Sequence, residues 1–459
     1  MPAAEVGTIC LALAIIVGSA NLLGHLFVKF RQPRIVGEIL AGVIFGSAVL
    51  GRVVPAVGEL FGAEGSITAS VLSFLYNLGL LMLMFVSGSA ARRVLASENR
   101  RPTAWLLAIG TTLPFILGLG LATILPLNEL AGPSGTDASI TIVFAIAVSV
   151  TSIPVISHIF NSLGIINTRF ASVVLGVAVL EDIMLWVALA VATALAAATA
   201  SGVITDEVST HVGYTVAYLI AGLAVMPRLL RFASRARWNV LAHASPIGWI
   251  VTVLFFYVAV AGLLDVTLVF AAFLAGFGIV GGIKGSERER QRESLDLINR
   301  FSFAVLIPVY TFLIGYQLDF TEQFSLPMLI AFLIGSSLIQ LIAVGTASRL
   351  AGFRGLDIVN LALTSNARGG PGIVLASVAF DAGIINAPFF TTLVVTAIVT
   401  SQVAGWWLGY VLRKGWPLLS GSDLERRGAR PEGALDGYED QDPVHAGSLV
   451  VSAGSHQGS

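Results

Sequence analysis

Long apolar runs recur along the whole chain. Thirteen stretches of about 20 residues are apolar enough to cross a bilayer as a helix. They lie at 6–28, 33–50, 67–90, 103–126, 139–163, 170–200, 209–230, 246–264, 266–283, 301–317, 325–348, 356–382 and 388–412. Only 12% of the 459 residues are charged, whereas about 25% is usual in soluble domains. The sequence therefore predicts an all-α polytopic protein of the cell (plasma or inner) membrane, with 13 transmembrane helices in the lipid bilayer.

The segments that connect these runs alternate in charge. Lysine and arginine follow the first run and every second run after it, whereas acidic residues dominate the other segments. By the positive-inside rule, this pattern predicts an N-terminus outside the cell and a cytoplasmic C-terminus. Residues 416–459 lack apolar periodicity and are expected to form a disordered cytoplasmic tail. The net charge of −1 does not indicate a nucleic-acid partner, and a single cysteine excludes a disulfide framework.

The run at 139–163 is interrupted near its middle. Thr151, Ser152 and Pro154 lie there in the otherwise aliphatic sequence AVSVTSIPVIS. Proline removes a backbone donor and clashes with the preceding turn, so the helix is expected to break at this point. A simple kink is the alternative, because proline is common in transmembrane helices.

The run at 356–382 has a stronger interruption. Its sequence TSNARGGPGIV places Gly369 and Gly370 beside a proline, and both residue types disfavour helix. This run enters the membrane from the side opposite to the run at 139–163, so the two units are predicted to be inverted repeats. Paired broken helices of this kind are typical of transporters with a site at the membrane midplane. The alternative is that the glycines serve only helix packing.

Two adjacent carboxylates lie in the middle of the run at 170–200. Intramembrane acids are candidates for functional sites, and Glu181 and Asp182 point about 100° apart on a helix. Burial favours a proton on such an acid, whereas a cation favours its ionised form, so Asp182 could hold either a proton or a monovalent metal cation. Thr151 and Ser152 could supply further oxygen ligands, and no histidine–cysteine cluster suggests a transition metal. A structural ion pair between helices is the alternative.

Four other ionisable residues lie within or near the ends of apolar runs. Arg368, inside the second interruption, could neutralise the carbonyl ends of the broken helices or pair with Glu181, and a purely structural role is the alternative. Glu38 is expected to be structural. His25 and His158 lie near cytoplasmic ends, where a histidine could modulate a pH response but usually has no special role.

Five further motifs occur along the chain. They are QPRIVGEILAGVIFGSAVLG (32–51), YNLGLLMLMFVSG (76–88), FAAFLAGFGI (270–279), IPVYTFLIGYQLD (307–319) and ARGGPGIVLASVAFDAGII (367–385). In kind and order they resemble the monovalent cation:proton antiporter-2 family with its Kef-type membrane domain. The resemblance covers about residues 7–413 and implies Na⁺/H⁺ or K⁺/H⁺ antiport without a cofactor.

The resemblance also implies an arrangement of helices. It suggests a homodimer in which a core moves against a dimerisation part, exposing the essential carboxylate Asp182 to each side in turn. The dimerisation part would be about 6–90 and 246–317, the core about 103–200 and 325–413, and a linker helix 209–230.

Two positions depart from the family pattern. The first acid of the pair, usually Asp, Asn or Gln, is Glu181, and Gln340 stands where many relatives carry a lysine. A lysine that releases its proton when the cation binds would add a second proton to the cycle, whereas an amide cannot titrate. We therefore expect electroneutral exchange of one cation for one proton.

Other classes of function are kept as alternatives. One is transport of an organic solute on a related inverted-repeat fold, which a large apolar vestibule would favour. Another is a K⁺ efflux system gated by a separate soluble subunit. An enzyme is least expected, because no nucleophile–base pair or metal motif stands out.

Overall fold

The computed structural model describes most of the chain. The described residues are 2–29, 32–46, 49–54, 60–61, 65–95, 106–166, 168–200, 213–215, 217–236, 239–264, 266–280, 286–318 and 324–420. Met1–Leu419 form one compact unit. The expected tail falls almost entirely outside the described residues, although Leu418 and Leu419 are buried and Asn360 Nδ2 donates to the Leu418 carbonyl at 3.1 Å.

Helices make up the unit, and the described residues contain no β-strand beyond an isolated bridge between Ala131 and Ile385. The first half has α1 (Ala3–Lys29), α2 (Arg34–Phe45), α3 (Leu50–Val53), α5 (Ile67–Leu95), η1 (Leu106–Thr111), α7 (Thr112–Ala122), η2 (Leu127–Leu130), α8 (Asp137–Ser149), α9 (Ile153–Ser162) and α10 (Arg169–Ala200). The second half has η3 (Ala221–Val225), α12 (Met226–Arg235), α13 (Val240–Ala244), α14 (Pro246–Leu263), α15 (Leu268–Ile279), α16 (Ser286–Phe301), η4 (Ser302–Leu306), α17 (Ile307–Gln317), α18 (Leu326–Leu350), α19 (Leu356–Ser365), α20 (Gly369–Asp381) and α21 (Ala387–Arg413).

Eight helices in the described residues are long and apolar enough to cross a membrane. They are Ala3–Lys29, Ile67–Arg92, Arg169–Ala197, Gly213–Ser234, Pro246–Leu263, Glu289–Gln317, Leu326–Leu350 and Ala387–Arg413. The other apolar runs of the sequence fall on shorter or interrupted helices, such as α2, α15 and the pair α8–α9. The count of thirteen spans therefore stays a prediction.

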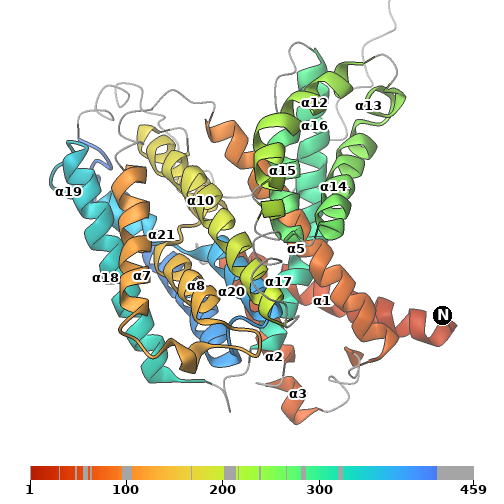
Figure 1. The fold of residues 1–459 in the computed structure, drawn as a ribbon, viewed down its shortest axis with the longest axis horizontal. Coiled ribbons are helices and arrows are strands. Elements are labelled where there is room, and N and C mark those ends of the chain that lie inside the picture. The colour runs from red at the N-terminus through yellow and green to blue at the C-terminus, as the bar shows by residue number, and fades with distance from the viewer. Residues whose placement is uncertain are drawn as a thin grey trace, which may run out of the picture. The chain divides into compact units, whose positions relative to one another are not determined.

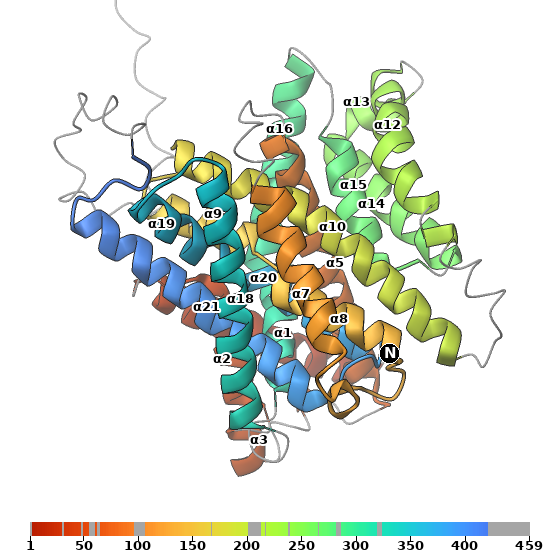
Figure 2. The ribbon, with the colours of Figure 1, turned by 60° about the vertical axis from the view of Figure 1, so that its left-hand side comes forward.

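The helices pack in two groups. In one, α5 packs on α15, α2 on both α1 and α17, and α14 on α15; in the other, α7 and α10 pack on α8, α18 on α19 and α20 on α21. Figures 1 and 2 show α18, α19 and α21 on one side and α12, α14 and α15 on the other. Helix α10 reaches across, because it contacts α8 of one group and α5 of the other.

Glycines bring α2 and α17 into direct backbone contact. A Cβ on Gly42 of α2 would overlap the carbonyl oxygen of Phe312, and one on Gly315 of α17 would overlap the carbonyl oxygen of Ile39. Small residues at such contacts let two membrane helices approach closely. Glycines join α5 and α15 in the same way.

In the α5–α15 pair, Gly88 faces the carbonyl of Phe273 and Gly276 faces the carbonyl of Phe85, each without room for a Cβ. Gly42 and Gly276 both close an LAG sequence, and each packs on a helix from the other half of the chain.

Glu38 is tied into the first group of helices. One of its carboxylate oxygens lies 2.8 Å from Arg34 Nε, and the other accepts a hydrogen bond from Thr311 Oγ1 at 2.9 Å. Arg34 also donates to Asn21 of α1. With both oxygens paired, Glu38 links α1, α2 and α17, which fits the structural role expected for it.

Candidate functional site

Two broken helices cross in the second group of helices. The chain leaves helix between α8 and α9 at Val150–Ser152, and between α19 and α20 at Asn366–Arg368. Thr151 Oγ1 donates to the Ser365 carbonyl at 2.7 Å, and the Ser152 N–H donates to the Ala367 carbonyl at 2.7 Å. Pro154 lies in the first turn of α9 rather than in the break itself.

Arg368 forms hydrogen bonds with carbonyl groups at the C-terminal end of α8. Its guanidinium donates to the carbonyls of Ala147 at 2.5 Å and Val148 at 3.2 Å, in the last turn of that helix. The side chain is 2% exposed and also interacts electrostatically with Glu181. No ion pair within 4.0 Å joins these two among the described residues. The guanidinium thus lies beside the partial negative charge of the helix end, and its role in transport stays a prediction.

Gly369 and Gly370 differ in their surroundings. Gly369 has φ +32°, and a Cβ there would clash with the side chains of Val155 and Ser152. A Cβ on Gly370 would meet nothing within 4 Å. The crossover therefore needs glycine at 369 for both backbone conformation and space, whereas position 370 has room for a side chain.

The acidic pair lies beside the crossover on α10. Glu181 and Asp182 are 2% and 1% exposed. One Glu181 oxygen accepts from Thr111 Oγ1 at 3.2 Å, whereas neither Asp182 oxygen has a hydrogen-bond partner among the described residues. Asp182 is about 20 Å along the helix from Arg169, by a rise of ~1.5 Å per residue, and so lies at mid-membrane depth. The two acids therefore differ: Glu181 has one hydrogen-bonded oxygen and one buried oxygen without a partner in the described structure, whereas neither oxygen of Asp182 has a partner there.

Gln340 of α18 also reaches the crossover. It is 1% exposed, and its Nε2 lies 3.4 Å from Thr151 Oγ1. Its Oε1 is buried without a partner in the part of the chain that the structure describes. A cavity of about 10 Å³ lies nearby, lined by Gly110, Val174, Val177, Glu181, Val344, Leu361 and Ser365. A volume of this size holds about one water molecule.

Three hydroxyls that hold the site were not singled out as site residues from the sequence. Thr400 Oγ1 accepts from the Arg368 N–H at 3.3 Å, and Ser401 Oγ accepts from the Gly369 N–H at 3.1 Å. Thr111 bonds Glu181. The sequence does hold a signal for these residues, because hydroxyl pairs stand out in apolar helices. It does not say which backbone groups the hydroxyls meet. His25 is exposed on α1, and the side chain of His158 lies outside the described residues.

Comparisons with known proteins agree on one family. A family model described as the transmembrane region of sodium/hydrogen exchangers matches residues 11–414. The Na(+)/H(+)-K(+) antiporter GerN of Bacillus cereus is 23% identical over 85% of this chain and 93% of its own. The Na(+)/H(+) antiporter NhaS4 of Synechocystis is 25% identical over 87% of this chain and 96% of its own.

Two further matches extend the comparison. K(+)/H(+) antiporter 1 of Saccharomyces cerevisiae is 26% identical over 86% of this chain, which spans 45% of the yeast protein. Among solved structures, the sodium proton antiporter MjNhaP1 of Methanocaldococcus jannaschii superposes with a TM-score of 0.60 at 13% identity. That match covers 89% of this chain and 98% of the other. The chain therefore has the fold of that structure.

Proposed function

Because the chain belongs to the sodium/hydrogen exchanger family, we propose that it is a secondary active antiporter in which Asp182 alternately binds a proton and Na⁺ or K⁺. The family match makes it a multi-pass membrane cation/proton antiporter, and its relatives are transporters rather than enzymes. The transported ions are its substrates, and no cofactor takes part.

One observation carries this proposal. Both oxygens of Asp182 are buried at mid-membrane depth without a hydrogen-bond partner among the described residues. Buried polar groups are almost always hydrogen-bonded, and a buried bare charge is costly, so this carboxylate needs a proton or a cation. Thr151 and Ser152 lie at the neighbouring crossover and are proposed as further oxygen ligands.

The size of the cavity at the crossover supports an ion as substrate. It has room for about one water molecule, and its described lining includes Glu181 and Ser365 but not Asp182. A dehydrated monovalent cation fits such a space, whereas an organic solute would need a larger vestibule.

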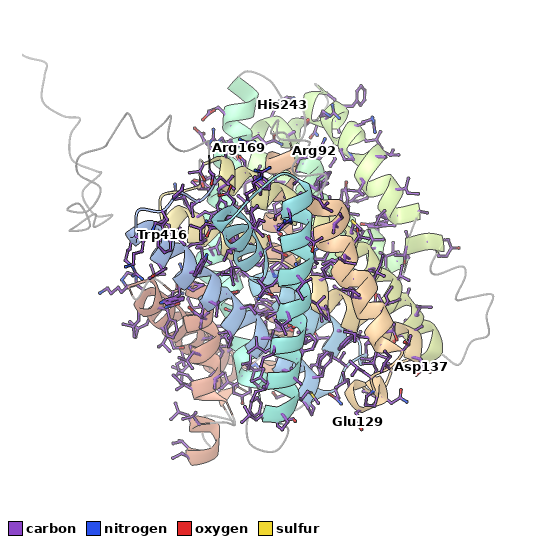
Figure 3. All side chains as sticks on the ribbon, turned by 90° about the vertical axis from the view of Figure 1, so that its left-hand side faces the viewer. Arg92, Glu129, Asp137, Arg169, His243 and Trp416 are labelled. Carbon is purple, nitrogen blue, oxygen red and sulfur yellow. The ribbon has the colours of Figure 1, made fainter. Side chains whose placement is uncertain are left out.

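The distribution of charge supports the proposed orientation. Figure 3 places Arg92, Arg169 and His243 toward one end of the bundle and Glu129 and Asp137 toward the other. The positive-inside rule would make the arginine end cytoplasmic. In this orientation α8 runs inward to the crossover from outside and α19 outward from inside, as in an inverted repeat.

The two packed groups of helices support a core that moves against a dimerisation part in alternating access. The glycine contacts bring the backbones of the α2–α17 and α5–α15 pairs together, and α10 contacts both groups. Movement of the group that carries Asp182 would expose it to each side in turn. A homodimer held by the other group completes this proposal.

Electroneutral exchange follows from the groups at the site. Gln340 cannot titrate, and Arg368 keeps its charge while it closes the end of α8. Glu181 can also titrate, and we propose that it keeps one protonation state throughout the cycle. Asp182 alone then changes its occupant, which gives one proton for one cation.

Proton flux in proteoliposomes tests the central claim. Na⁺, K⁺ and Li⁺ are offered in turn to the wild type, Asp182→Asn and the control Asp137→Asn, which makes the same chemical change at the outer end of α8. We expect cation-driven flux in the wild type and control and its loss in Asp182→Asn. Full exchange by Asp182→Asn would disprove the role of this carboxylate.

The stoichiometry is tested in the same vesicles. The membrane potential is set with an ion and an ionophore other than K⁺ and valinomycin, chosen so that the protein does not transport this ion. Electroneutral exchange should then keep the same rate at any voltage. A rate that follows the imposed voltage would contradict one-for-one exchange while leaving antiport intact.

A further inference from the structure

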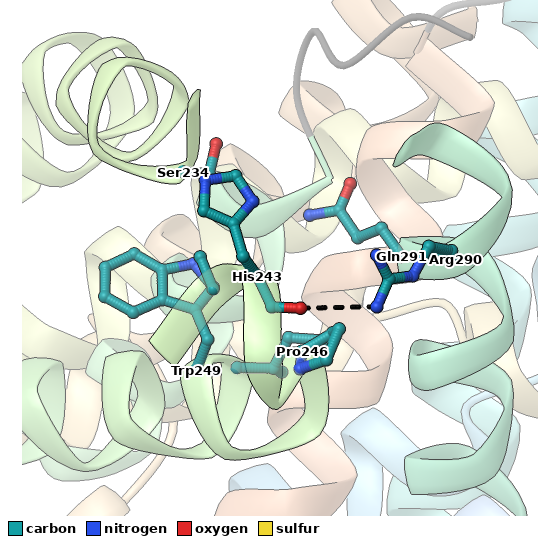
Figure 4. A pocket seen from close by; sticks show the side chains of 8 residues that line it. Ser234, His243, Pro246, Trp249, Arg290 and Gln291 are labelled. Atoms are coloured by element: carbon teal, nitrogen blue, oxygen red, sulfur yellow. Dashed lines mark hydrogen bonds between the residues drawn. The ribbon is translucent and has the colours of Figure 1, made fainter. Parts of the chain in front are cut away.

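A second pocket lies far from the crossover, between α12, α13, α14 and α16. Its volume is about 50 Å³, and its lining residues are Ser234, Ala242, His243, Pro246, Trp249, Ile250, Arg290 and Gln291. Figure 4 shows Arg290 and Gln291 of α16 facing His243 and Trp249 across this space. No acidic residue is among the described side chains that line it.

The pocket lies where three candidate membrane spans end. Ser234 is the last residue of the span Gly213–Ser234, Pro246 is the first of the span Pro246–Leu263, and Arg290 is the second of the span Glu289–Gln317. The pocket is therefore level with the headgroups of the membrane leaflet rather than with its hydrocarbon core. In the orientation proposed above, with the arginine-rich end inside, this is the cytoplasmic leaflet.

Two side chains of the pocket, Trp249 and Arg290, carry N–H donors. The indole N–H of Trp249 is buried and has no hydrogen-bond partner in the described structure. Arg290 uses one Nη2–H for the His243 carbonyl, at 3.3 Å, and a guanidinium carries five N–H donors. The N-terminus of the 18-residue helix α14 adds its partial positive charge at Pro246. These groups together favour a ligand that accepts hydrogen bonds and carries negative charge.

Exposed apolar side chains surround the pocket. Phe232 and Val240 are each 70% exposed, and Leu241 and Ile247 are each 40% exposed. In water such a cluster would be costly, whereas beside lipid acyl chains it is favourable. The occupant should therefore join an anionic head to apolar chains.

We propose that this pocket binds the phosphate group of an anionic phospholipid of the cytoplasmic leaflet. The Trp249 N–H and the Arg290 guanidinium donate to the phosphate oxygens, and the exposed apolar side chains lie against the acyl chains. Basic pockets between membrane helices on the cytoplasmic side bind anionic headgroups in this way. The site is independent of which ion the crossover carries.

Lipid-dependent thermal stability tests the site. The full-length protein is purified in detergent, and the fraction that survives heating is measured by size-exclusion chromatography with added phosphatidylglycerol, phosphatidylcholine or inorganic phosphate. We expect phosphatidylglycerol to raise the midpoint temperature of the wild type, and the two other additions to raise it little. If inorganic phosphate alone gives the full shift, a free anion is the ligand and the lipid assignment is wrong.

Three variants decide whether the effect belongs to this pocket. Trp249→Phe keeps an aromatic ring but removes the N–H, and Arg290→Gln removes the charge. We expect each to reduce the phosphatidylglycerol shift to less than half. The control Arg292→Gln loses the same charge on α16 outside the pocket lining and should keep the full shift.

Native mass spectrometry supplies a second readout that does not depend on the stability of the variants. The number of phosphatidylglycerol molecules retained per chain should fall in Trp249→Phe and Arg290→Gln but not in Arg292→Gln. Equal retention in all three variants, or an unchanged thermal shift in the first two, would overturn the proposal.

Discussion

At the residue scale, single side chains satisfy the backbone that the crossover leaves unpaired. Arg368 bonds two carbonyls at the end of α8, and Thr400 and Ser401 accept the first N–H groups of α20. Unpaired backbone at membrane depth costs several kcal/mol per group, so these contacts make the broken helices possible. In the described structure neither oxygen of Asp182 has a hydrogen-bond partner.

Adjacent glycines give a matched test at this scale. Gly369→Ala should destabilise the protein by about 1–3 kcal/mol, because the residue has a positive φ and its Cβ would clash with Val155 and Ser152. Gly370→Ala is the control and should change stability by less than about 1 kcal/mol. Thermal stability and cation-driven proton flux measure both variants. Equal behaviour of the two alanines would contradict the described crossover.

At the element scale, close glycine contacts set which helices pair. Gly42→Ala should destabilise the α2–α17 pair by about 1–3 kcal/mol, since the added methyl group would overlap the Phe312 carbonyl. Gly18→Ala in α1 is the control, because a Cβ there meets nothing within 4 Å, and it should be neutral or slightly stabilising. Midpoint temperatures in one detergent compare them, and a stable Gly42→Ala would argue against this helix pairing.

At the scale of the whole molecule, hydrogen bonds from α5 and α17 to α20 join the two groups of helices. Tyr76 Oη of α5 donates to Asp381 Oδ2 of α20 at 3.2 Å, and Tyr310 Oη of α17 donates to Ser377 Oγ of α20 at 3.3 Å. The tyrosine rings lie 5.1 Å apart. If the core moves against the dimerisation part, these bonds must break in each transport cycle.

Removing one of these bonds should loosen α20. Tyr76→Phe keeps the ring and loses a hydrogen bond of about 0.5–1.5 kcal/mol, so hydrogen–deuterium exchange at the C-terminal end of α20 should become faster by up to ~10-fold. Tyr214→Phe, at a half-exposed position, is the control. Unchanged protection of α20 in Tyr76→Phe would mean that this contact does not hold the two groups together.

The class of the protein, the two helix interruptions and the acidic pair can be predicted from the amino-acid sequence alone. These features are local: apolar length, proline and glycine, and adjacent carboxylates can each be recognised within one segment. The expected family is confirmed by the match over residues 11–414. The roles of the site residues, the homodimer and the stoichiometry stay predictions.

The contacts among the site residues depend on the tertiary structure. Arg368 meets Ala147 and Gln340 meets Thr151 across about 200 residues of sequence, and no local pattern encodes such distant pairs. The same holds for Gly369 against Gly370, which look alike in sequence but differ in φ and in space. Composition and periodicity place residues in the membrane, whereas close packing of distant helices determines which of them meet.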